Sequence, residues 1–201
     1  VDIPFRARVF ALGRDEHLAV LVVHHIAADG ASTVPLARDL LGAYQARSRN
    51  EAPTWTPLPV QYPDYTLWQL DRLGDPTDPQ SLAAAQAEYW RTTLAGLPDV
   101  LTLPTDRPRP AQQSFRGDIV RFPIDPALHT RLTRLASAHG TTLFMTVHTA
   151  LAVLLARLSG SDDIAIGSPI AGRGHRALDD LIGMFVNTVV LRTRIPGAAP
   201  F

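Results

Sequence analysis

The apolar and polar residues at the start of the chain predict two strands joined by a turn. Residues 5–12 (FRARVFAL) alternate in character, as the two faces of a half-buried strand do. Residues 17–23 (HLAVLVV) are apolar on both faces, which is typical of a central, buried strand. We therefore expect the second strand to lie inside a sheet and to run into His24 and His25.

A helix and a long proline-rich connection come next. The apolar spacing from Val34 to Tyr44 predicts a helix, with Ser32 or Thr33 as its N-cap. Six prolines then interrupt residues 51–80, with four aromatic residues among them. We expect so long a connection to cross between two lobes, and residues 65–73 can hold a short helix within it.

The remainder of the chain mixes helices and strands. Helices are predicted over residues 81–94, 126–140 and 143–160, and strands over residues 117–124, 163–170 and 184–195. Asp125 should cap the second of these helices and Thr141 or Thr142 the third, which is apolar on most sides and should be buried. Residues 104–110 read as extended, and residues 171–180 as a loop with a helical turn. This mixture is typical of an α/β sandwich.

Composition excludes several classes of function. The 201 residues are 46% hydrophobic and 19% charged, which suits a globular interior. Basic and acidic residues number 19 each, so there is no basic excess for binding nucleic acid. Neither a membrane span nor a signal peptide is visible, which favours a cytoplasmic protein. Cys is absent and every basic residue is Arg, which excludes disulfides, thiolate nucleophiles and lysine chemistry.

The stretch HHIAADG, residues 24–30, holds the residues of clearest chemical character. Neighbouring strand residues point to opposite faces, so we expect one of His24 and His25 to pack and the other to face a cleft. Asp29, if buried, needs a cation or several N–H donors, and Gly30 lets the backbone turn into the helix. Spacing alone favours a structural histidine over a catalytic one, and it disfavours a metal site because no third ligand is near.

Several stretches carry a resemblance to one family. HHIAADG resembles the HHxxxDG signature of the condensation domains of nonribosomal peptide synthetases. YPDYTLWQ, residues 62–69, is similar to their Y-x-D-Y-A-x-W-Q motif, with Thr66 in place of Ala. IGMFVNTVVLR, residues 182–192, is similar to their I-G-x-F-V-N-T-x-x-L-R motif, and SPIAGR (168–173) and LPTDRPRP (103–110) also match. These motifs occur in order over nearly the whole chain, which is therefore identified as a member of that family.

The resemblance implies an α/β, chloramphenicol-acetyltransferase-like fold, in which two lobes form a V around a tunnel. Residues 1–50 would end the N-terminal lobe, residues 51–80 would cross between the lobes, and residues 81–201 would begin the C-terminal lobe. Members of the family are longer than this chain, which resembles the middle of such a domain. We therefore expect it to be inactive alone.

The implied reaction is the formation of an amide bond. Upstream and downstream peptidyl carrier proteins would present a donor thioester and an acceptor amine on phosphopantetheine arms, with an adenylation domain in the same assembly line. The chain itself would bind no cofactor and no metal. His25 matches the second His of the motif, and it would keep the attacking amine neutral and aimed or accept its proton after attack. A histidine has a pKa of about 6.5 and a free α-amine one of about 8. Accepting the proton after attack, when the nitrogen is cationic and more acidic, therefore needs less driving force than removing it before attack.

Other motif residues receive supporting roles from the resemblance. His24 would pack and bond structurally, Asp29 would hold the loop, and Gly30 would allow the backbone to approach the pantetheine arm. The side-chain amide of Asn187 can donate a hydrogen bond to, and accept one from, an amide-bearing arm or a substrate. An equal alternative is that Asn187 is an ordinary strand residue with no binding role. Trp68 is expected to pack between lobes, with substrate binding as the lesser alternative.

One substitution in the motif region, one predicted ion-pair partner and three alternative functions accompany this interpretation. Ala31 stands where many members have Trp, which alters the tunnel wall. The Arg that would pair with Asp29 is predicted to lie in an N-terminal part outside this chain. An epimerization domain shares HHxxxDG, but SPIAGR followed by IGMFVNT favours condensation. A non-catalytic domain that recruits carrier proteins or tailoring enzymes would not need His25, and an inert fragment of the family is the third alternative.

Overall fold

The computed structural model describes residues 3–108 and 110–195, so one residue of the expected extended stretch 104–110 lies outside the described part. The chain divides into two compact units. The first comprises Val1–Trp90 and Ser168–Val189, and the second comprises Arg91–Gly167 and Val190–Phe201. HHIAADG, YPDYTLWQ and the start of IGMFVNTVVLR all belong to the first unit.

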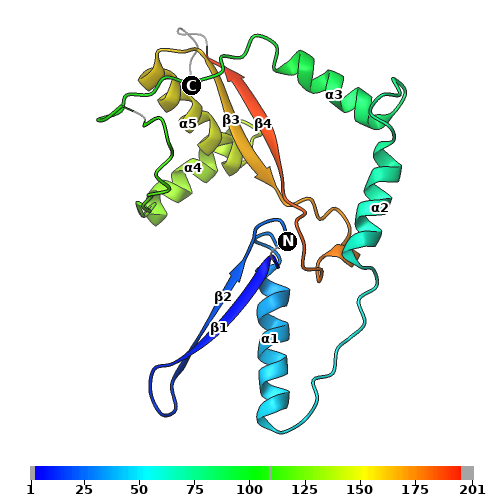
Figure 1. The fold of residues 1–201 in the computed structure, drawn as a ribbon. Coiled ribbons are helices and arrows are strands. Elements are labelled where there is room, and N and C mark those ends of the chain that lie inside the picture. The colour runs from blue at the N-terminus through cyan, green and yellow to red at the C-terminus, as the bar shows by residue number, and fades with distance from the viewer. Residues whose placement is uncertain (1–2, 109, 196–201) are drawn as a thin grey trace. The chain divides into compact units, whose positions relative to one another are not determined.

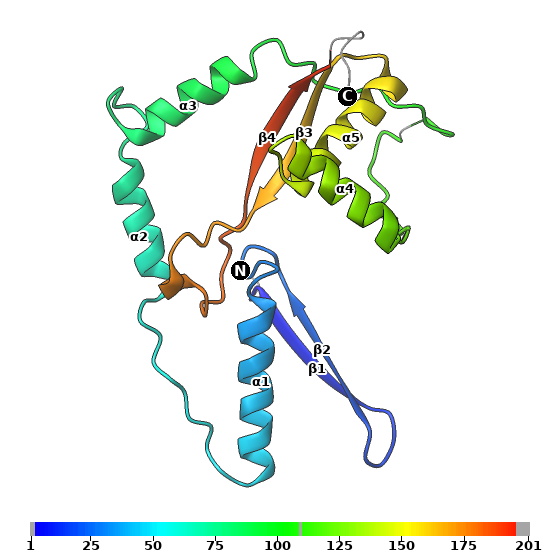
Figure 2. The same ribbon diagram turned by 180° about the vertical axis from the view of Figure 1, so that it is seen from behind.

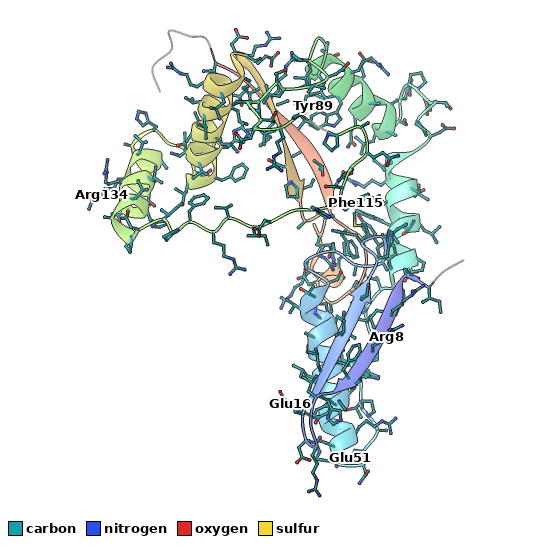
Figure 3. The ribbon with its side chains drawn as sticks, turned by 60° about the vertical axis from the view of Figure 1, so that its left-hand side comes forward. Arg8, Glu16, Glu51, Tyr89, Phe115 and Arg134 are labelled. Carbon is teal, nitrogen blue, oxygen red and sulfur yellow. The ribbon has the colours of Figure 1, made fainter. Side chains whose placement is uncertain are left out.

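The first unit begins with an antiparallel hairpin, drawn in blue in Figure 1. β1 (Phe5–Ala11) pairs with β2 (His17–Val23), with Phe5 opposite Val23. Both predicted strands are confirmed, but the prediction that the second is central and buried is wrong. Among the described residues β2 pairs with β1 alone and Val22 is 60% exposed; Figure 3 draws the hairpin with its side chains and labels Arg8 on β1. The apolar pattern reflects a need for cover on both faces, which the described part of the chain does not supply.

Helix α1 (Thr33–Ser48) follows the hairpin where the sequence predicts a helix, and its N-cap residue is Ser32, one of the two predicted. Ser32 occupies the N-cap position, yet its side chain makes no capping hydrogen bond. Its hydroxyl bonds instead to groups far away in sequence, Gly183 among them. The Thr33 hydroxyl donates to the carbonyl oxygen of Gly30 at 2.6 Å. The Ser32 hydroxyl, which the local sequence predicts to cap the helix, therefore forms long-range hydrogen bonds instead.

The proline-rich connection contains a second helix, α2 (Tyr62–Leu73), which begins earlier than predicted. The Asp64 carboxylate accepts a hydrogen bond from the Gln61 N–H at 2.7 Å, which places a negative charge at the positive end of the helix. Thr66, which replaces the Ala of the motif, donates its hydroxyl to the Tyr62 carbonyl oxygen at 3.1 Å. The helix therefore accommodates this substitution without an unpaired hydroxyl.

The core of the first unit joins α2 to the segment that follows β3. Its buried residues are Tyr65, Leu178, Leu181 and Phe185. The rings of Tyr65 and Phe185 lie 4.7 Å apart, and Tyr62 meets Phe185 edge-on with ring centroids 5.2 Å apart. Such aromatic pairs stabilise a core beyond the area that they bury. The predicted helical turn is η1 (Arg176–Leu178), which brings Leu178 into this core.

The second unit contains α4 (Pro126–Ala138) and α5 (Leu143–Ser159), which pack against each other, and the end of α3 (Leu82–Thr93). The predicted caps of α4 and α5 are confirmed. Asp125 accepts from the backbone N–H of the third residue of α4 at 2.8 Å, and Thr142 accepts from the corresponding N–H of α5 at 3.2 Å. Local sequence alone specifies such caps, because donor and acceptor lie within one turn.

Two apolar segments of the second unit lack the cover that their patterns predict. The prediction that α5 is buried is wrong, since its buried residues are Thr146 and Ala152. Residues 117–124 form no strand, and Val120 within them is 87% exposed. A strand needs a neighbour for its backbone hydrogen bonds, and in the part of the chain that the structure describes nothing pairs with this segment.

Strands β3 (Asp163–Ile170) and β4 (Asn187–Arg194) form a second two-stranded sheet. Figures 1 and 2 show them side by side and running in opposite directions. β3 has its predicted bounds, but β4 begins later than the predicted residue 184. Phe185 is drawn into the core of the first unit, and its N–H bonds to Asp29 at 3.1 Å, so it is not available for the ladder.

Arg192, in IGMFVNTVVLR, ties this sheet to the end of α3. Its guanidinium makes two hydrogen bonds to the carboxylate of Asp163. It also donates to the carbonyl oxygens of Thr93 at 2.8 Å and Ala95 at 2.9 Å. The hydrogen bond from Arg192 lowers the pKa of Asp163. A cation at a helix C-terminus is favourable, because the last carbonyl groups have no partner within the helix.

No single helix among the described residues is long and apolar enough to cross a membrane. Helices α4 and α5 meet the requirement of length and composition only as a pair, and they are bent by 101° at the break between them.

Candidate active site

HHIAADG forms a tight turn at the end of β2. The strand ends at Val23, so His24 and His25 do not occupy its two faces as predicted. The His24 N–H donates to the Pro4 carbonyl oxygen at 2.8 Å, and the His24 ring Nδ1 accepts from the Ile26 N–H at 3.1 Å. His25 is exposed and makes no hydrogen bond within the described residues. His24 thus bonds within the turn, but it is exposed rather than packed as predicted, while the exposed imidazole of His25 makes no such bond.

Asp29 lies at the other end of this turn and is only 5% exposed. Its Oδ1 accepts from the Ser32 N–H at 2.9 Å, from the Ser32 hydroxyl at 2.8 Å and from Arg173 Nη2 at 3.0 Å. Its Oδ2 accepts from the Phe185 N–H at 3.1 Å. The carboxylate therefore has the cation and the N–H donors that a buried Asp requires.

These donors decide the protonation state of Asp29. Burial alone would raise the pKa of its carboxyl group. Hydrogen bonds from the Ser32 hydroxyl, the Phe185 N–H, Arg173 and the Ser32 N–H outweigh that effect and lower the pKa from 3.8 to about 2. Asp29 is therefore ionised at neutral pH and is unsuited to general acid or base catalysis there. Its charge serves to hold the loops around it.

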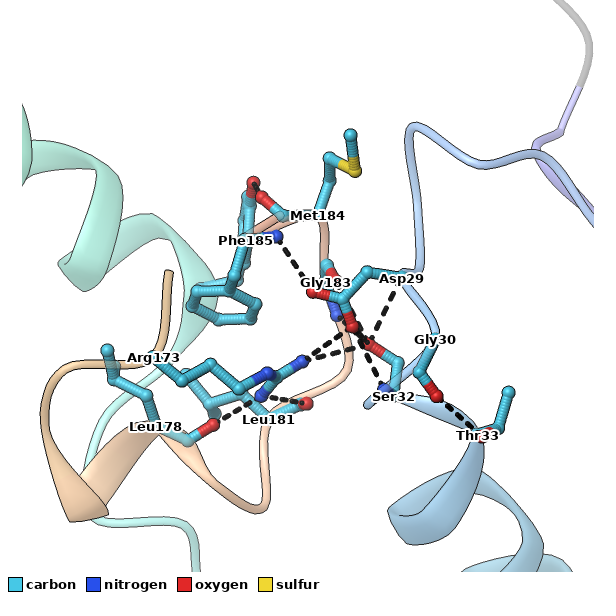
Figure 4. Close-up of polar contacts among 11 residues, drawn as sticks. Asp29, Gly30, Ser32, Thr33, Arg173, Leu178, Leu181, Gly183, Met184 and Phe185 are labelled. Carbon is cyan, nitrogen blue, oxygen red and sulfur yellow. Dashed lines mark hydrogen bonds and ion pairs between the residues drawn. The ribbon is translucent and has the colours of Figure 1, made fainter. Parts of the chain in front are cut away.

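Arg173 is the cationic partner of Asp29, and its side chain is 6% exposed. Its Nη1 donates to the carbonyl oxygens of Leu178 and Leu181, and its guanidinium carbon lies 4.0 Å from the ring centroid of Phe185 (Figure 4). The prediction that the partner of Asp29 lies outside this chain is wrong. Sequence reasoning missed Arg173 although SPIAGR ends in it, because no local pattern links it to a residue so distant along the chain.

Two backbone bonds complete the connection between HHIAADG and IGMFVNTVVLR. The Asp29 N–H donates to the Gly183 carbonyl oxygen at 3.1 Å, and the Gly183 N–H donates to Ser32 Oγ at 3.1 Å. Tyr62, from the YPDYTLWQ motif, donates its hydroxyl to the Met184 carbonyl oxygen at 2.7 Å. Segments that are far apart in sequence therefore meet around one buried carboxylate.

Two glycines permit this close approach. Gly172 has a φ of +68°, and a Cβ there would lie 1.9 Å from the Phe185 carbonyl oxygen. A Cβ at Gly183 would lie 2.2 Å from the ring of Tyr62. Gly30 differs, because a Cβ there would meet nothing within 4 Å, and its φ is not in the left-handed region. The chain therefore turns into the helix at Gly30 with neither a left-handed backbone nor a tight contact that would require glycine.

The remaining predicted site residues lie at the edges of this cluster. Asn187 is exposed at the start of β4, where its side-chain oxygen accepts from the Thr188 N–H at 2.8 Å. Trp68 is exposed on α2, with its ring 6.1 Å from Tyr65. Within residues 3–108 and 110–195, no hydrogen bond or ring contact joins His25, Asn187 and Trp68. The structure connects His25 and Asn187 through the backbone around Asp29 rather than directly.

Comparison with known proteins decides the family. The sequence model of the Condensation domain matches residues 1–201. The chain belongs to the condensation-domain family. A probable non-canonical nonribosomal peptide synthetase of Salinispora arenicola, CymA, is 54% identical over 200 residues, and a dimodular nonribosomal peptide synthase of Bacillus subtilis is 52% identical over 197 residues. The matches cover 100% and 98% of this chain but only 3% and 8% of those relatives.

Solved structures give the same family. The X-domain from teicoplanin biosynthesis is 36% identical with a TM-score of 0.89, and the match covers 98% of this chain and 44% of that one. A holo four-domain nonribosomal peptide synthetase bound to AMP and glycine is 28% identical with a TM-score of 0.76, covering 96% of this chain and 14% of that one. The predicted α/β, chloramphenicol-acetyltransferase-like fold of the condensation-domain family is confirmed, as a partial domain.

Proposed function

We propose that this chain is part of a condensation domain that forms an amide bond in a nonribosomal peptide synthetase. The donor is an acyl or peptidyl thioester, the acceptor is the α-amine of an aminoacyl thioester, and both are carried on phosphopantetheine arms of peptidyl carrier proteins. An adenylation domain in the same assembly line loads these carriers. The chain supplies side chains and no cofactor of its own. The nonribosomal peptide synthetases among its relatives support this proposal.

One observation carries the proposal, namely that the His25 turn is fixed at both ends while the His25 imidazole remains exposed. His24 anchors the start of the turn to Pro4 at 2.8 Å, and the ionised, almost fully buried Asp29 anchors its end. A rigid turn that presents an unpaired imidazole suits a group that must meet a substrate in one geometry. An architectural turn would have no need to leave that ring free.

In the proposed reaction the acceptor amine attacks the carbonyl carbon of the donor thioester. The new C–N bond forms, the nitrogen becomes cationic, and the C–S bond breaks as the amide forms. The proton lost from nitrogen passes to His25 Nε2 or Nδ1 and then to the departing thiolate, which leaves as the thiol of the phosphopantetheine arm. His25 also orients the neutral amine before attack. An imidazole ring has one nitrogen that can accept a proton and one that can donate a hydrogen bond, which suits both roles.

Supporting roles complete the proposed site. His24 shapes the turn, Asp29 holds it, and Gly30 leaves open space beside the backbone for the pantetheine arm. Asn187 and Trp68, both exposed, would contact the arm or the substrate. We propose further that residues 1–50 end an N-terminal lobe, residues 51–80 cross between lobes, and residues 81–201 begin a C-terminal lobe.

The experiment replaces His25 by Ala in the complete condensation domain and measures amide formation between two loaded carrier proteins. General acid–base catalysis contributes about 100-fold to 10,000-fold, so we expect the turnover number to fall by at least about 100-fold. His17→Ala, at the exposed start of β2, is the matched control and should keep its activity. Near-normal turnover in the His25 variant would remove that residue from the chemistry.

A second candidate function is a non-catalytic recruitment domain. The high structural similarity to the X-domain favours it, since one structure of that domain is a complex with OxyB. A recruiting surface has no use for the free imidazole of His25. If the wild-type domain binds loaded carrier proteins or a tailoring enzyme but forms no amide, this second candidate replaces the first.

A further inference from the structure

We propose that Ser32 is a positioning residue for amide formation, an inference that rests on the function proposed above. Its buried hydroxyl holds the backbone that leads to Asn187 against the turn that carries His25. The sequence suggests only a helix cap at this position, and in the structure the Ser32 hydroxyl makes no capping hydrogen bond.

Ser32 is a polar residue with no exposed surface, and polar partners surround its hydroxyl. Its Oγ lies 2.8 Å from Asp29 Oδ1 and 3.0 Å from Arg173 Nη2. It also lies 2.9 Å from the carbonyl oxygen and 3.1 Å from the nitrogen of Gly183 (Figure 4). A buried hydroxyl with this many partners is confined to one rotamer and one position.

The single proton of the hydroxyl has one best acceptor. Asp29 is ionised, and a carboxylate is a stronger acceptor than a carbonyl oxygen. The Gly183 carbonyl oxygen already receives the Asp29 N–H at 3.1 Å. The Ser32 proton therefore points to Asp29, and the two lone pairs of Oγ accept from the nearer donors, Arg173 Nη2 at 3.0 Å and the Gly183 N–H at 3.1 Å, while the Asp29 N–H lies farther away at 3.3 Å.

This allocation makes the Ser32 oxygen the acceptor for a backbone N–H that is 151 residues away in sequence. Without it, the Gly183 N–H loses its acceptor and the segment that leads to Asn187 is free to shift. The same change removes a hydrogen bond from Asp29, which ends the His25 turn. Because a displacement of about 1 Å at a site can cost about 100-fold in rate, a small shift here is enough to impair catalysis.

The neighbouring hydroxyl supplies a matched control. Thr33, the first residue of α1, donates to the Gly30 carbonyl oxygen at 2.6 Å, which is a local contact three residues back along the chain. Thr33→Ala removes a hydroxyl from the same turn without touching Gly183 or Arg173. A difference between the Ser32 and Thr33 variants therefore isolates the long-range contact from any general effect on the turn.

The test compares Ser32→Ala, Ser32→Cys and Thr33→Ala with the wild type in the complete condensation domain. Amide formation between loaded carrier proteins is measured well below the melting temperature, and rates are normalised to the folded fraction. We expect Ser32→Ala to lower kcat by about 10-fold to 100-fold while KM for the acceptor carrier changes by less than about 3-fold. Ser32→Cys, which keeps a weak acceptor of similar shape, should lose less, and Thr33→Ala should stay within about 2-fold of wild type.

Each result has a distinct meaning. If the wild type forms no amide, the proposed function fails before Ser32 is tested. If the wild type is active and Ser32→Ala retains the kcat of Thr33→Ala, the positioning role is wrong. A rise in KM with unchanged kcat would also overturn it, because loss of positioning lowers kcat. Should Ser32→Ala fail to fold, Ser32→Cys decides the question, with full kcat opposing the proposal and reduced kcat supporting it.

Discussion

Truncating Arg173 removes the cation at the centre of the Asp29 cluster. Arg173→Ala leaves Asp29 buried with its Ser32 and Phe185 donors only, and it leaves the carbonyl oxygens of Leu178 and Leu181 without their guanidinium partner. It also removes the cation from the face of Phe185, 4.0 Å from the ring centroid. Breaking a buried ion pair by removing one partner costs about 3–5 kcal/mol. Because other donors remain on Asp29, we expect a loss of unfolding free energy near 3 kcal/mol.

The pH dependence of that loss provides a second measurement. Asp29 has a folded pKa of about 2 against an ordinary value of 3.8, so its paired form stabilises the fold above pH 4 and this contribution disappears as the pH falls through 2. Losing the hydrogen bond from Arg173 should raise the pKa of Asp29 in the variant. The stability gap between wild type and variant should therefore be full at pH 5 and above and should narrow as the pH falls from about 4 towards 2.

Chemical denaturation of the complete domain measures both quantities. Arg176→Ala, an exposed arginine in the neighbouring η1 turn, is the matched control and should change stability by less than about 0.5 kcal/mol. If Arg173→Ala costs no more than Arg176→Ala, the guanidinium does not hold the cluster together. If the difference in unfolding free energy between wild type and Arg173→Ala stays constant down to pH 2, the loss of stability does not depend on the charge of Asp29.

Two further expectations concern backbone packing and the isolated chain. Gly172→Ala should lower the unfolding free energy by at least about 2 kcal/mol in thermal melts, because the left-handed backbone disfavours a side chain and the new Cβ meets the Phe185 carbonyl oxygen. Gly174→Ala, where a Cβ meets nothing within 4 Å, is the control, and equal losses in the two variants would contradict this account. Residues 1–201 alone should self-associate in sedimentation velocity and form no amide, because β2 and residues 117–124 leave apolar side chains exposed. A monodisperse monomer that forms the amide at the rate of the complete domain would refute that expectation.

Local sequence determined the secondary structure wherever a signal and its partner lie within a few residues. The alternation in β1, the Asp125 and Thr142 caps and the bounds of β3 all follow from neighbouring residues. The same locality explains the errors. The pattern of residues 117–124 indicates a strand, and the pattern of α5 indicates a buried helix. Both need packing partners from other parts of the structure, and a local pattern does not show whether such partners are present.

The motifs also identified the family from sequence, but only the tertiary structure revealed how they meet. HHIAADG pointed to His25 and Asp29, yet nothing in its spacing indicated that Asp29 pairs with Arg173, 144 residues away. The Ser32 hydroxyl, which looks like a helix cap, is committed to Gly183 instead. The physical reason is that a buried carboxylate takes its donors from whichever segments the folded chain brings next to it. Which segments reach Asp29 depends on the packing of Tyr62, Tyr65 and Phe185 into one core.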